Sequence, residues 1–183
     1  MSDFGMTDDE LQLLDANVTD RDVVWEWGCG ASTLFLAERC KFVYAVEHQR
    51  VWFAKLLPKI PSNVALLYVP QEHSIPEGFD GDYSSHRRYV EAYNGKGIDV
   101  VVIDGRARVA CLEQVAQRAD YGPPDDMRVF LHDFGREEYN AGTNHWRVTG
   151  GAGNLGMLGT PELKWTDQVN RLDGADNETR RVK

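Results

Sequence analysis

Two glycines and two acids stand where a cofactor could bind in this 183-residue chain. Glu26 precedes the bend that holds Gly28 and Gly30, and Glu47 directly follows the apolar run 42–46. Glycines at a bend let the main chain approach a ligand closely. A carboxylate at the end of the next strand can accept hydrogen bonds from both hydroxyls of a ribose. The types and spacing of these residues therefore predict a site for a cofactor that contains a nucleoside.

The residues around the bend predict a strand, a tight turn and a helix. Residues 23–27 form an apolar run interrupted only by its acid, and residues 32–39 are predicted as a helix whose first turn Ser32 or Thr33 can cap. A dinucleotide-binding bend carries a third glycine where this chain has Thr33. The charge of Glu26 would also repel a phosphate at the helix N-terminus. The bend therefore suits a cationic or polar cofactor better than NAD.

Further apolar runs, alternating with helices, predict the rest of a parallel sheet. The expected strands and helices cover residues 50–57 (helix), 64–69 (strand), 98–103 (strand), 109–119 (helix) and 127–131 (strand). Alternation of this kind forms parallel sheets, and ligands bind outside the carboxyl ends of their strands. Asp104 and Arg106 follow one run, and His132 and Asp133 follow another. We therefore expect these four residues at the same edge of the sheet as the bend.

Patterns near the two ends of the chain complete the predicted elements. Thr7 and Glu10, three residues apart, form a capping box that predicts a helix. The segments 145–149 and 155–158 flank a glycine-rich turn and predict a strand pair. The residues after 161 are polar and low in apolar side chains, a composition that favours disorder.

The stretches 26–33 and 45–48 together resemble the class I S-adenosylmethionine-dependent methyltransferases, and the likeness extends from about Thr7 to about Pro161. The resemblance implies an α/β fold, a three-layer sandwich with a mostly parallel seven-stranded sheet whose last strand is antiparallel, in one domain over residues 1–183. It also implies that the glycine turn holds the methionine part of the cofactor and that Glu47 holds the ribose. The expected cofactor is S-adenosylmethionine, which leaves as S-adenosylhomocysteine. The residues expected to bind it are Glu26, Gly28, Cys29, Gly30, Ala31, Ser32, Thr33, Glu47, His48 and Asp104.

The long polar segment 71–97 holds the candidates for adenine and substrate recognition. The resembled family often places an acid or an amide after the third strand to meet the adenine amine, and Gln71 and Glu72 offer both types. The rest of the segment, with His73 and Tyr83, is expected to face the substrate; the alternative is an excursion over the solvated surface. Arg106 could anchor an anionic group of the substrate or could simply pair with neighbouring acids.

Methyl transfer to a hydroxyl requires a base, and the sheet edge offers three candidates for this catalytic role. These are Asp104, His132 and Asp133, of which the histidine titrates closest to neutral pH. Some O-methyltransferases of the resembled fold use acids at these two positions to hold a divalent ion. They follow the second acid with Asn, whereas this chain has Phe134, and two oxygen ligands alone make a weak site. We therefore favour a site without a metal.

Charge and composition argue against several classes of partner. The formal net charge of −9 disfavours a nucleic-acid partner, because phosphate backbones require clustered Lys and Arg. The three cysteines show no metal-ligand spacing, and the chain shows neither a targeting segment nor an apolar run long enough to cross a bilayer. We therefore expect a cytoplasmic protein with reduced thiols that acts on a small molecule.

Two other functions remain open at this point. An oxidoreductase of the dinucleotide-binding type would use the same kind of bend, although Thr33 and Glu26 count against it. A catalytically silent module that binds a cofactor or a partner is the second alternative. The polar residues expected at the ends of the fourth and fifth strands count against that alternative. The leading hypothesis is a methyltransferase with an unidentified small-molecule acceptor.

Overall fold

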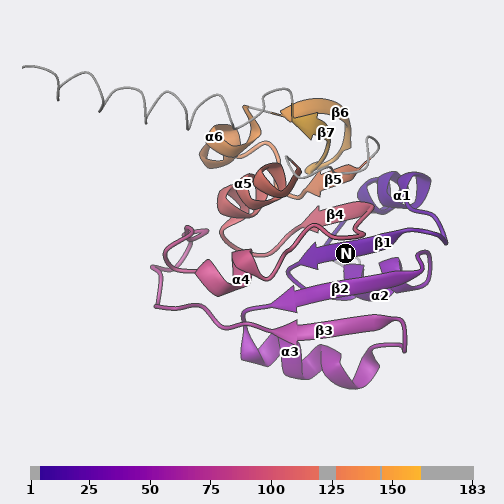
Figure 1. The fold of residues 1–183 in the computed structure, drawn as a ribbon, viewed down its shortest axis with the longest axis horizontal. Helices are drawn as coiled ribbons and strands as arrows, with labels where there is room; N and C mark the ends of the chain where they lie inside the picture. The colour runs from indigo at the N-terminus through magenta and orange to yellow at the C-terminus, as the bar shows by residue number, and fades with distance from the viewer. Residues whose placement is uncertain (1–4, 120–126, 145, 162–183) are drawn as a thin grey trace, which may run out of the picture.

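The computed structural model describes residues 5–119, 127–144 and 146–161 and is built on one seven-stranded sheet (Figure 1). In chain order the strands are β1 (Val23–Trp27), β2 (Phe42–Glu47), β3 (Val64–Tyr68), β4 (Val100–Ile103), β5 (Arg128–Leu131), β6 (Trp146–Ala152) and β7 (Leu155–Pro161). Across the sheet they follow the order β3-β2-β1-β4-β5-β7-β6. Strands β1 to β5 pair in parallel, whereas β7 runs antiparallel to β5 and β6. The predicted sheet, with its last strand antiparallel, is confirmed.

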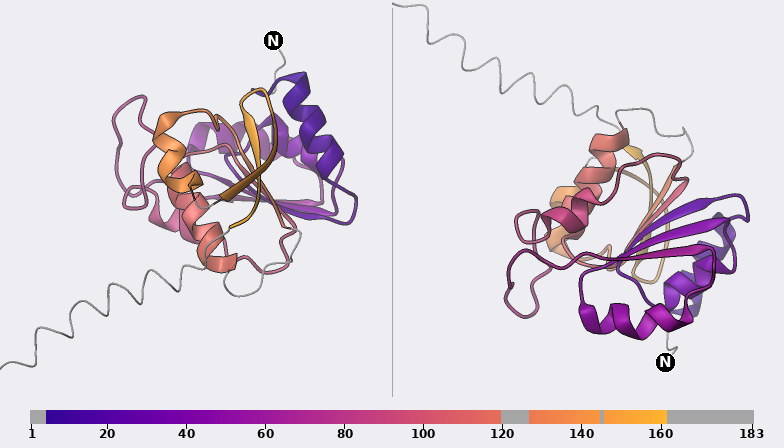
Figure 2. Two further views of the ribbon diagram at one scale, coloured as in Figure 1. Left: turned by 90° about the horizontal axis from the view of Figure 1, so that it is seen from above. Right: turned by 60° about the horizontal axis from the view of Figure 1, so that its bottom comes forward.

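Helices cover both faces of the sheet and give the predicted three layers. The helices are α1 (Asp8–Asn17), α2 (Ala31–Ala37), α3 (Arg50–Leu56), η1 (Leu57–Lys59), α4 (Arg87–Glu91), α5 (Arg108–Ala119), η2 (Glu137–Tyr139) and α6 (Asn140–Thr143). Figure 2 shows α1, α2 and α3 on one face, and α4, α5 and α6 on the other. Alternate side chains of β4 belong to the two cores: Val101 lies in the same core cluster as Leu112 of α5, and Val102 in the same cluster as Leu36 of α2. Because both faces are covered, the continuous apolar run of β4 is what a central strand requires.

Local sequence signals set several helix ends as expected. The Thr7 N–H donates to Glu10 Oε2 (2.7 Å), and the Glu10 N–H donates to Thr7 Oγ1 (3.4 Å), which confirms the capping box of α1. Helix α3 ends at Leu56 and passes into a short 3-10 turn that contains Pro58. Proline cannot continue an α-helix because it lacks the N–H and its ring clashes with the preceding turn.

Other elements differ from the sequence predictions. The strand pair turns at Gly153 and Asn154, so β6 runs on through the glycines at 150 and 151. A positive φ of 56° at Gly153 allows this tight hairpin, and cross-strand pairing outweighs the weak strand preference of glycine. The helices η2 and α6 were not predicted, because their sequence has no helical periodicity. The predicted tail after 161 lies outside the described residues.

None of the helices in the described ranges combines the length and the apolar character needed to span a bilayer.

Candidate active site

The carboxyl ends of β1, β2 and β4 lie at one edge of the sheet (Figure 1). A hollow of about 290 Å³ lies at this edge. The hollow is lined by residues from the ends of three strands, together with Gly5 and Trp52. These are residues 28–32 after β1, 47–49 at the end of β2 and 104–106 after β4. We call this space the cofactor hollow. The sequence predicted the turn, Glu47 and Asp104 at neighbouring strand ends. The structure brings all three together at the cofactor hollow.

The two glycines of the turn have different structural roles. Gly28 has a φ of +89°, and a Cβ there would lie only 2.5 Å from the backbone nitrogen of Gly105. Gly30 has an extended backbone, with a φ of −177°, which any residue can adopt. A Cβ at Gly30 would meet no atom within 4 Å. The fold therefore requires glycine at position 28, whereas glycine at position 30 leaves free space beside backbone that lines the cofactor hollow.

Alanine substitutions should separate these two roles. Gly30→Ala is expected to unfold like the wild type but to bind S-adenosylhomocysteine about tenfold more weakly, a loss of about 1.4 kcal/mol, because the methyl group occupies ligand space. Gly28→Ala is expected to lose about 1–3 kcal/mol of unfolding free energy through strain and overlap. Denaturant unfolding and calorimetric titration measure the two effects. Unchanged affinity in Gly30→Ala would contradict a ligand at this turn.

Glu47 is buried and presents a carboxylate to the cofactor hollow. The Cys29 N–H donates to Glu47 Oε2 (3.1 Å), and the Gln49 N–H donates to Oε1 (2.6 Å). An ionised carboxylate has about four acceptor positions, and these two bonds, with a weak third from the Cys29 thiol to Oε2 (3.5 Å), leave capacity for a hydroxyl donor. Burial raises the pKa of Glu47, which the two backbone bonds partly offset. The arrangement fits the predicted recognition of a ribose diol.

Glu26 lies beneath the turn and not in the hollow. Its side chain is fully buried and accepts hydrogen bonds from the hydroxyls of Ser32 and Thr33, each at 2.6 Å. Burial raises the pKa of Glu26 to about 8. Because this carboxyl lies beneath the turn and its charged form is disfavoured by burial, it repels an anion in the hollow less than the sequence suggested. Glu26 fixes the first turn of α2, and we assign it and Thr33 an indirect role in shaping the cofactor site.

Asp104 and His132, both proposed from the sequence, are in direct contact. His132 Nδ1 lies 2.9 Å from Asp104 Oδ1 and 3.8 Å from Asp133 Oδ1, and its Nε2 lies 3.6 Å from Glu10 Oε2. The hydrogen bond to Asp104, together with the charges of the three acids, raises the pKa of His132 despite its partial burial. Of these residues only Asp104 lines the cofactor hollow. The histidine is therefore placed to orient Asp104 from behind.

The pH dependence of stability should reveal the charge on His132. A histidine whose pKa is higher in the folded than in the unfolded chain contributes stability that is complete below about pH 6.5 and is lost as the pH rises through the folded-state pKa. His132→Gln should therefore lose more unfolding free energy relative to the wild type at about pH 5.5 than at about pH 9. Denaturant unfolding at both pH values measures this difference. An equal loss at both would show that His132 is not charged in the fold.

Glu10 was predicted only as a helix cap, yet it also reaches the site. Its side chain is 1% exposed, and its Oε1 accepts a hydrogen bond from the Asn154 N–H at the β6–β7 turn (2.6 Å). Burial would raise the pKa of Glu10, but the backbone bonds from Thr7 and Asn154 and the nearby His132 lower it below its usual value. The cap of α1 therefore connects the last hairpin to the histidine behind Asp104.

Arg108 joins the ends of β4 and β5 from within the protein. Its side chain is 5% exposed, and its Nη1 donates to the His132 carbonyl (2.6 Å) and to Asp133 Oδ2 (3.0 Å). Its Nε donates to the Gly105 carbonyl (3.2 Å), and its Nη2 donates to the Asp104 carbonyl (3.2 Å). Asp133, proposed as a catalytic residue, is therefore held in an ion pair by a buried arginine.

The remaining predicted site residues lie in several places. His48 and Arg106 line the cofactor hollow, whereas Gln71 and Glu72 do not; the Glu72 carboxylate pairs with Arg88 Nε at 2.9 Å. His73 and Tyr83 line two other cavities. Burial lowers the pKa of His48 to about 4, so its ring is neutral at physiological pH.

Sequence reasoning missed Gly5, Gln49, Trp52 and Gly105 as lining residues of the cofactor hollow. For Trp52, the signal was its position five residues after Glu47, at the start of the helix that follows β2. Within the described ranges, no group of three or more His, Cys, Asp or Glu side chains could hold a metal ion.

No family model and no curated protein sequence matches the chain. A methyltransferase-like protein from Silicibacter pomeroyi superposes with a TM-score of 0.66 at 22% identity, covering 91% of this chain and 93% of that one. A protein from Streptococcus mutans, described as a methyltransferase and solved with S-adenosylhomocysteine, gives a TM-score of 0.54 at 14% identity over 84% and 99% of the two chains.

An rRNA methylase from Streptococcus thermophilus gives a TM-score of 0.53 at 18% identity, covering 83% of this chain and 94% of that one. Of these three descriptions only the last names an acceptor, and the likeness concerns the fold that the proteins share. Together with the strand order and the antiparallel last strand, the comparisons show that this chain has the α/β fold of the class I methyltransferases.

Proposed function

We propose that the chain binds S-adenosylmethionine in the cofactor hollow and transfers its methyl group to a small-molecule acceptor. The observation that carries this proposal is the free space beside Gly30, flanked by the carboxylates of Glu47 and Asp104. The fold does not require glycine at that position, whereas a ligand held against the backbone does. The cationic sulfonium and amino groups of the cofactor suit a hollow that two acids line.

The lining residues divide the cofactor between them in this proposal. The free space of the turn 28–32 receives the methionine part, and Glu47 receives the ribose hydroxyls. His48, Gln49 and Trp52 line the hollow beyond Glu47. The neutral ring of His48 and the half-exposed indole of Trp52 offer flat apolar surfaces to the adenine. This assignment moves adenine recognition from Gln71 and Glu72 to the residues after β2.

When bound, the cofactor would supply a methyl group activated by its positive sulfur, which the lone pair of an acceptor would take in exchange for the carbon–sulfur bond. The protein has to hold the acceptor atom about 3 Å from that carbon and to receive any proton it loses. Of the three proposed catalytic residues, Asp104 is the one that lines the hollow. We therefore assign Asp104 the role of accepting the acceptor's proton or of orienting the acceptor. His132 positions Asp104, and Asp133 with Arg108 fixes the strand end.

A small molecule suits this site better than RNA does. The net charge of −9 opposes a polyanion. One similar protein is described as an rRNA methylase. We do not propose RNA as the acceptor of this chain.

Calorimetric titration with S-adenosylmethionine, S-adenosylhomocysteine and NAD tests the proposal. We expect the two methionine derivatives to bind at micromolar concentrations and NAD not to bind at the same protein concentration. Binding of NAD without a response to either derivative would establish the oxidoreductase alternative. Asp104→Asn separates an enzyme from a silent module: it should weaken cofactor binding, because one of the two acids of the hollow is neutralised, and at saturating cofactor it should still lose turnover by about 10²–10⁴-fold on any acceptor found.

A further inference from the structure

The two outermost strands of the described sheet, β3 and β6, differ in how well they are protected against pairing (Figure 1). An outermost strand presents unpaired N–H and C=O groups, and proteins block it with charges, bulges or proline. Strand β6 carries Arg147 and two register shifts against β7. Strand β3 consists of five uncharged residues without proline or glycine, and its register against β2 is regular. The outer side of β3 is therefore open to a further strand.

The backbone of β3 determines which residues a further strand would meet. The Val43 N–H donates to the Asn63 carbonyl (3.0 Å), and the Val69 N–H donates to the Glu47 carbonyl (2.8 Å). Odd-numbered residues at both ends of β3 therefore point their backbone groups at β2. Because this direction alternates along a strand, the even-numbered residues of β3 point theirs outward. In the described ranges no other strand lies beside these outward groups.

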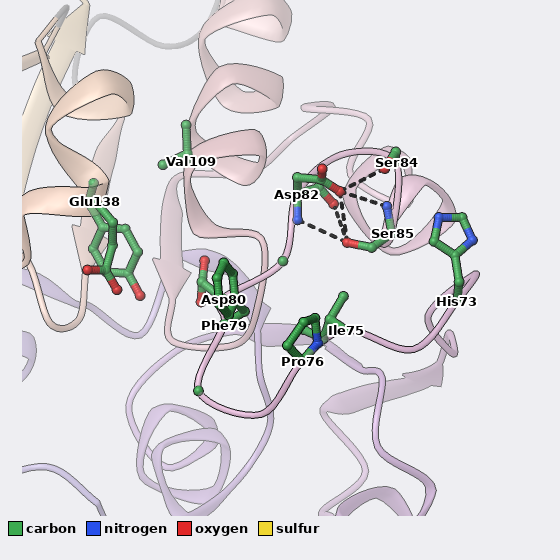
Figure 3. Close-up of a pocket in the computed structure, with 13 residues that line it drawn as sticks. His73, Ile75, Pro76, Phe79, Asp80, Asp82, Ser84, Ser85, Val109 and Glu138 are labelled. Atoms are coloured by element: carbon green, nitrogen blue, oxygen red, sulfur yellow. Dashed lines mark hydrogen bonds between the residues drawn. The ribbon is translucent and has the colours of Figure 1, made fainter.

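Exposed apolar side chains gather around the same strand. Nine large apolar side chains are exposed in the part of the chain that the structure describes, and six of them lie between residues 44 and 68. These six are Tyr44, Val51, Trp52, Leu57, Leu67 and Tyr68. The other three are Phe79, at the wall of a separate cavity (Figure 3), Tyr83 and Val148. Apolar side chains that cluster on a surface mark a site of interaction.

The exposed apolar side chains flank β3 on both faces of the sheet. Tyr68 lies on the face that α3 covers, where its ring centroid is 5.4 Å from that of Phe53. Leu57 is one helical turn beyond Phe53 and so lies on the same side of the helix. Leu67 lies on the opposite face with Tyr44 of β2, because side chains alternate along a strand. A strand added beside β3 would therefore meet apolar surface above and below it.

Charge favours contact between two acidic chains at this strand. The stretch 48–71 contains three basic residues and no Asp or Glu, in a chain with a net charge of −9. Two copies therefore repel each other less here than at an acidic surface. Lys55 is two residues from both Phe53 and Leu57, which places its charge on the side of α3 away from them.

We propose that β3 pairs with β3 of a second copy of the chain, antiparallel about a two-fold axis at Leu66, so that the dimer has one continuous sheet. In this register Leu66 lies opposite its counterpart, Val64 opposite Tyr68, and Ala65 opposite Leu67. The outward-pointing even residues then face one another, as hydrogen-bonded antiparallel pairs require. Each larger side chain off the axis meets a smaller one on its own face. The contact is the same for both copies and closes at two.

Sedimentation velocity of the full chain from about 1 to 100 μM tests the dimer. We expect a dimer at the upper concentration that dissociates on dilution. Leu67→Lys adds a charge to the open strand and should raise the dissociation constant about tenfold or more. Val148→Lys, at an exposed residue of the protected strand β6, is the matched control and should leave it unchanged. A monomer throughout, or a dimer that Leu67→Lys does not weaken, would overturn the proposal.

Cysteine substitutions test the register. Ala65→Cys and Leu67→Cys, mixed under mild oxidation, should form a disulfide between copies, because directly opposite residues of this kind have Cα atoms about 4.5 Å apart. Either variant alone should cross-link far less, since its two cysteines are diagonal neighbours about 7–8 Å apart. The wild type is the control, because its three cysteines are buried. Cross-linking equally strong in one variant alone would overturn this register, and none in the mixture would overturn the pairing.

A membrane is the other partner that suits exposed aromatic and basic side chains. Co-sedimentation of the chain with vesicles of phosphatidylcholine and phosphatidylglycerol tests this occupant, and we expect the chain to stay in the supernatant. A monomeric chain that sediments with the vesicles would assign this surface to a membrane and overturn the dimer.

Discussion

Replacing Arg108 by methionine is expected to lower the free energy of unfolding by about 3–5 kcal/mol, because it removes one partner of a buried ion pair. The guanidinium is 5% exposed and holds Asp133 Oδ2 at 3.0 Å together with the carbonyls of three residues around the strand ends. Its loss would leave these carbonyls without this donor and would leave Asp133 Oδ2 with the half-exposed Arg136, whose Nη2 lies at 2.9 Å. Denaturant unfolding at neutral pH measures the change.

Arg88→Met provides the matched control for this substitution. Arg88 is 59% exposed and pairs with Glu72 at 2.9 Å. Exposed ion pairs contribute about 0–1 kcal/mol, so this variant should stay close to the wild type. Similar small losses in both variants would mean that Arg108 does not connect the ends of β4 and β5 in the way the structure indicates.

Replacing Glu47 by alanine is expected to weaken S-adenosylhomocysteine binding by about 1–3 kcal/mol, because charge-assisted hydrogen bonds to the ribose hydroxyls are lost. The exposed acid Glu38, substituted in the same way, serves as the control. Because burial raises the pKa of Glu47, wild-type affinity should fall with decreasing pH sooner than a free glutamate would predict. Calorimetric titration of both variants measures the effect, and equal affinities would refute the ribose assignment.

Most of the fold could be predicted from the sequence because its signals are local. The apolar runs that become β1 to β5 and the capping box of Thr7 and Glu10 each depend on neighbouring residues. The rule that parallel strands share their carboxyl edge then brought the glycine turn, Glu47 and Asp104 to one hollow. The short elements η2 and α6 depend on tertiary packing and left no periodic pattern.

The parts of the site that the sequence did not predict depend on side-chain direction and on distant contacts. Whether Glu26 points into the hollow or beneath the turn cannot be decided from its position, and it points beneath. The contact of Glu10 with Asn154 joins residues 144 positions apart, and the bond from Arg108 to Asp133 spans 25.

The position of S-adenosylhomocysteine in a crystal structure of the full chain decides whether this edge of the sheet is the cofactor site. We expect density for the ligand in the cofactor hollow, with the amino-acid part against the backbone of residues 28–30 and both ribose hydroxyls within hydrogen-bond distance of the Glu47 carboxylate. Ligand density elsewhere on the protein, with this hollow filled by side chains or solvent, would show that the hollow does not bind the cofactor.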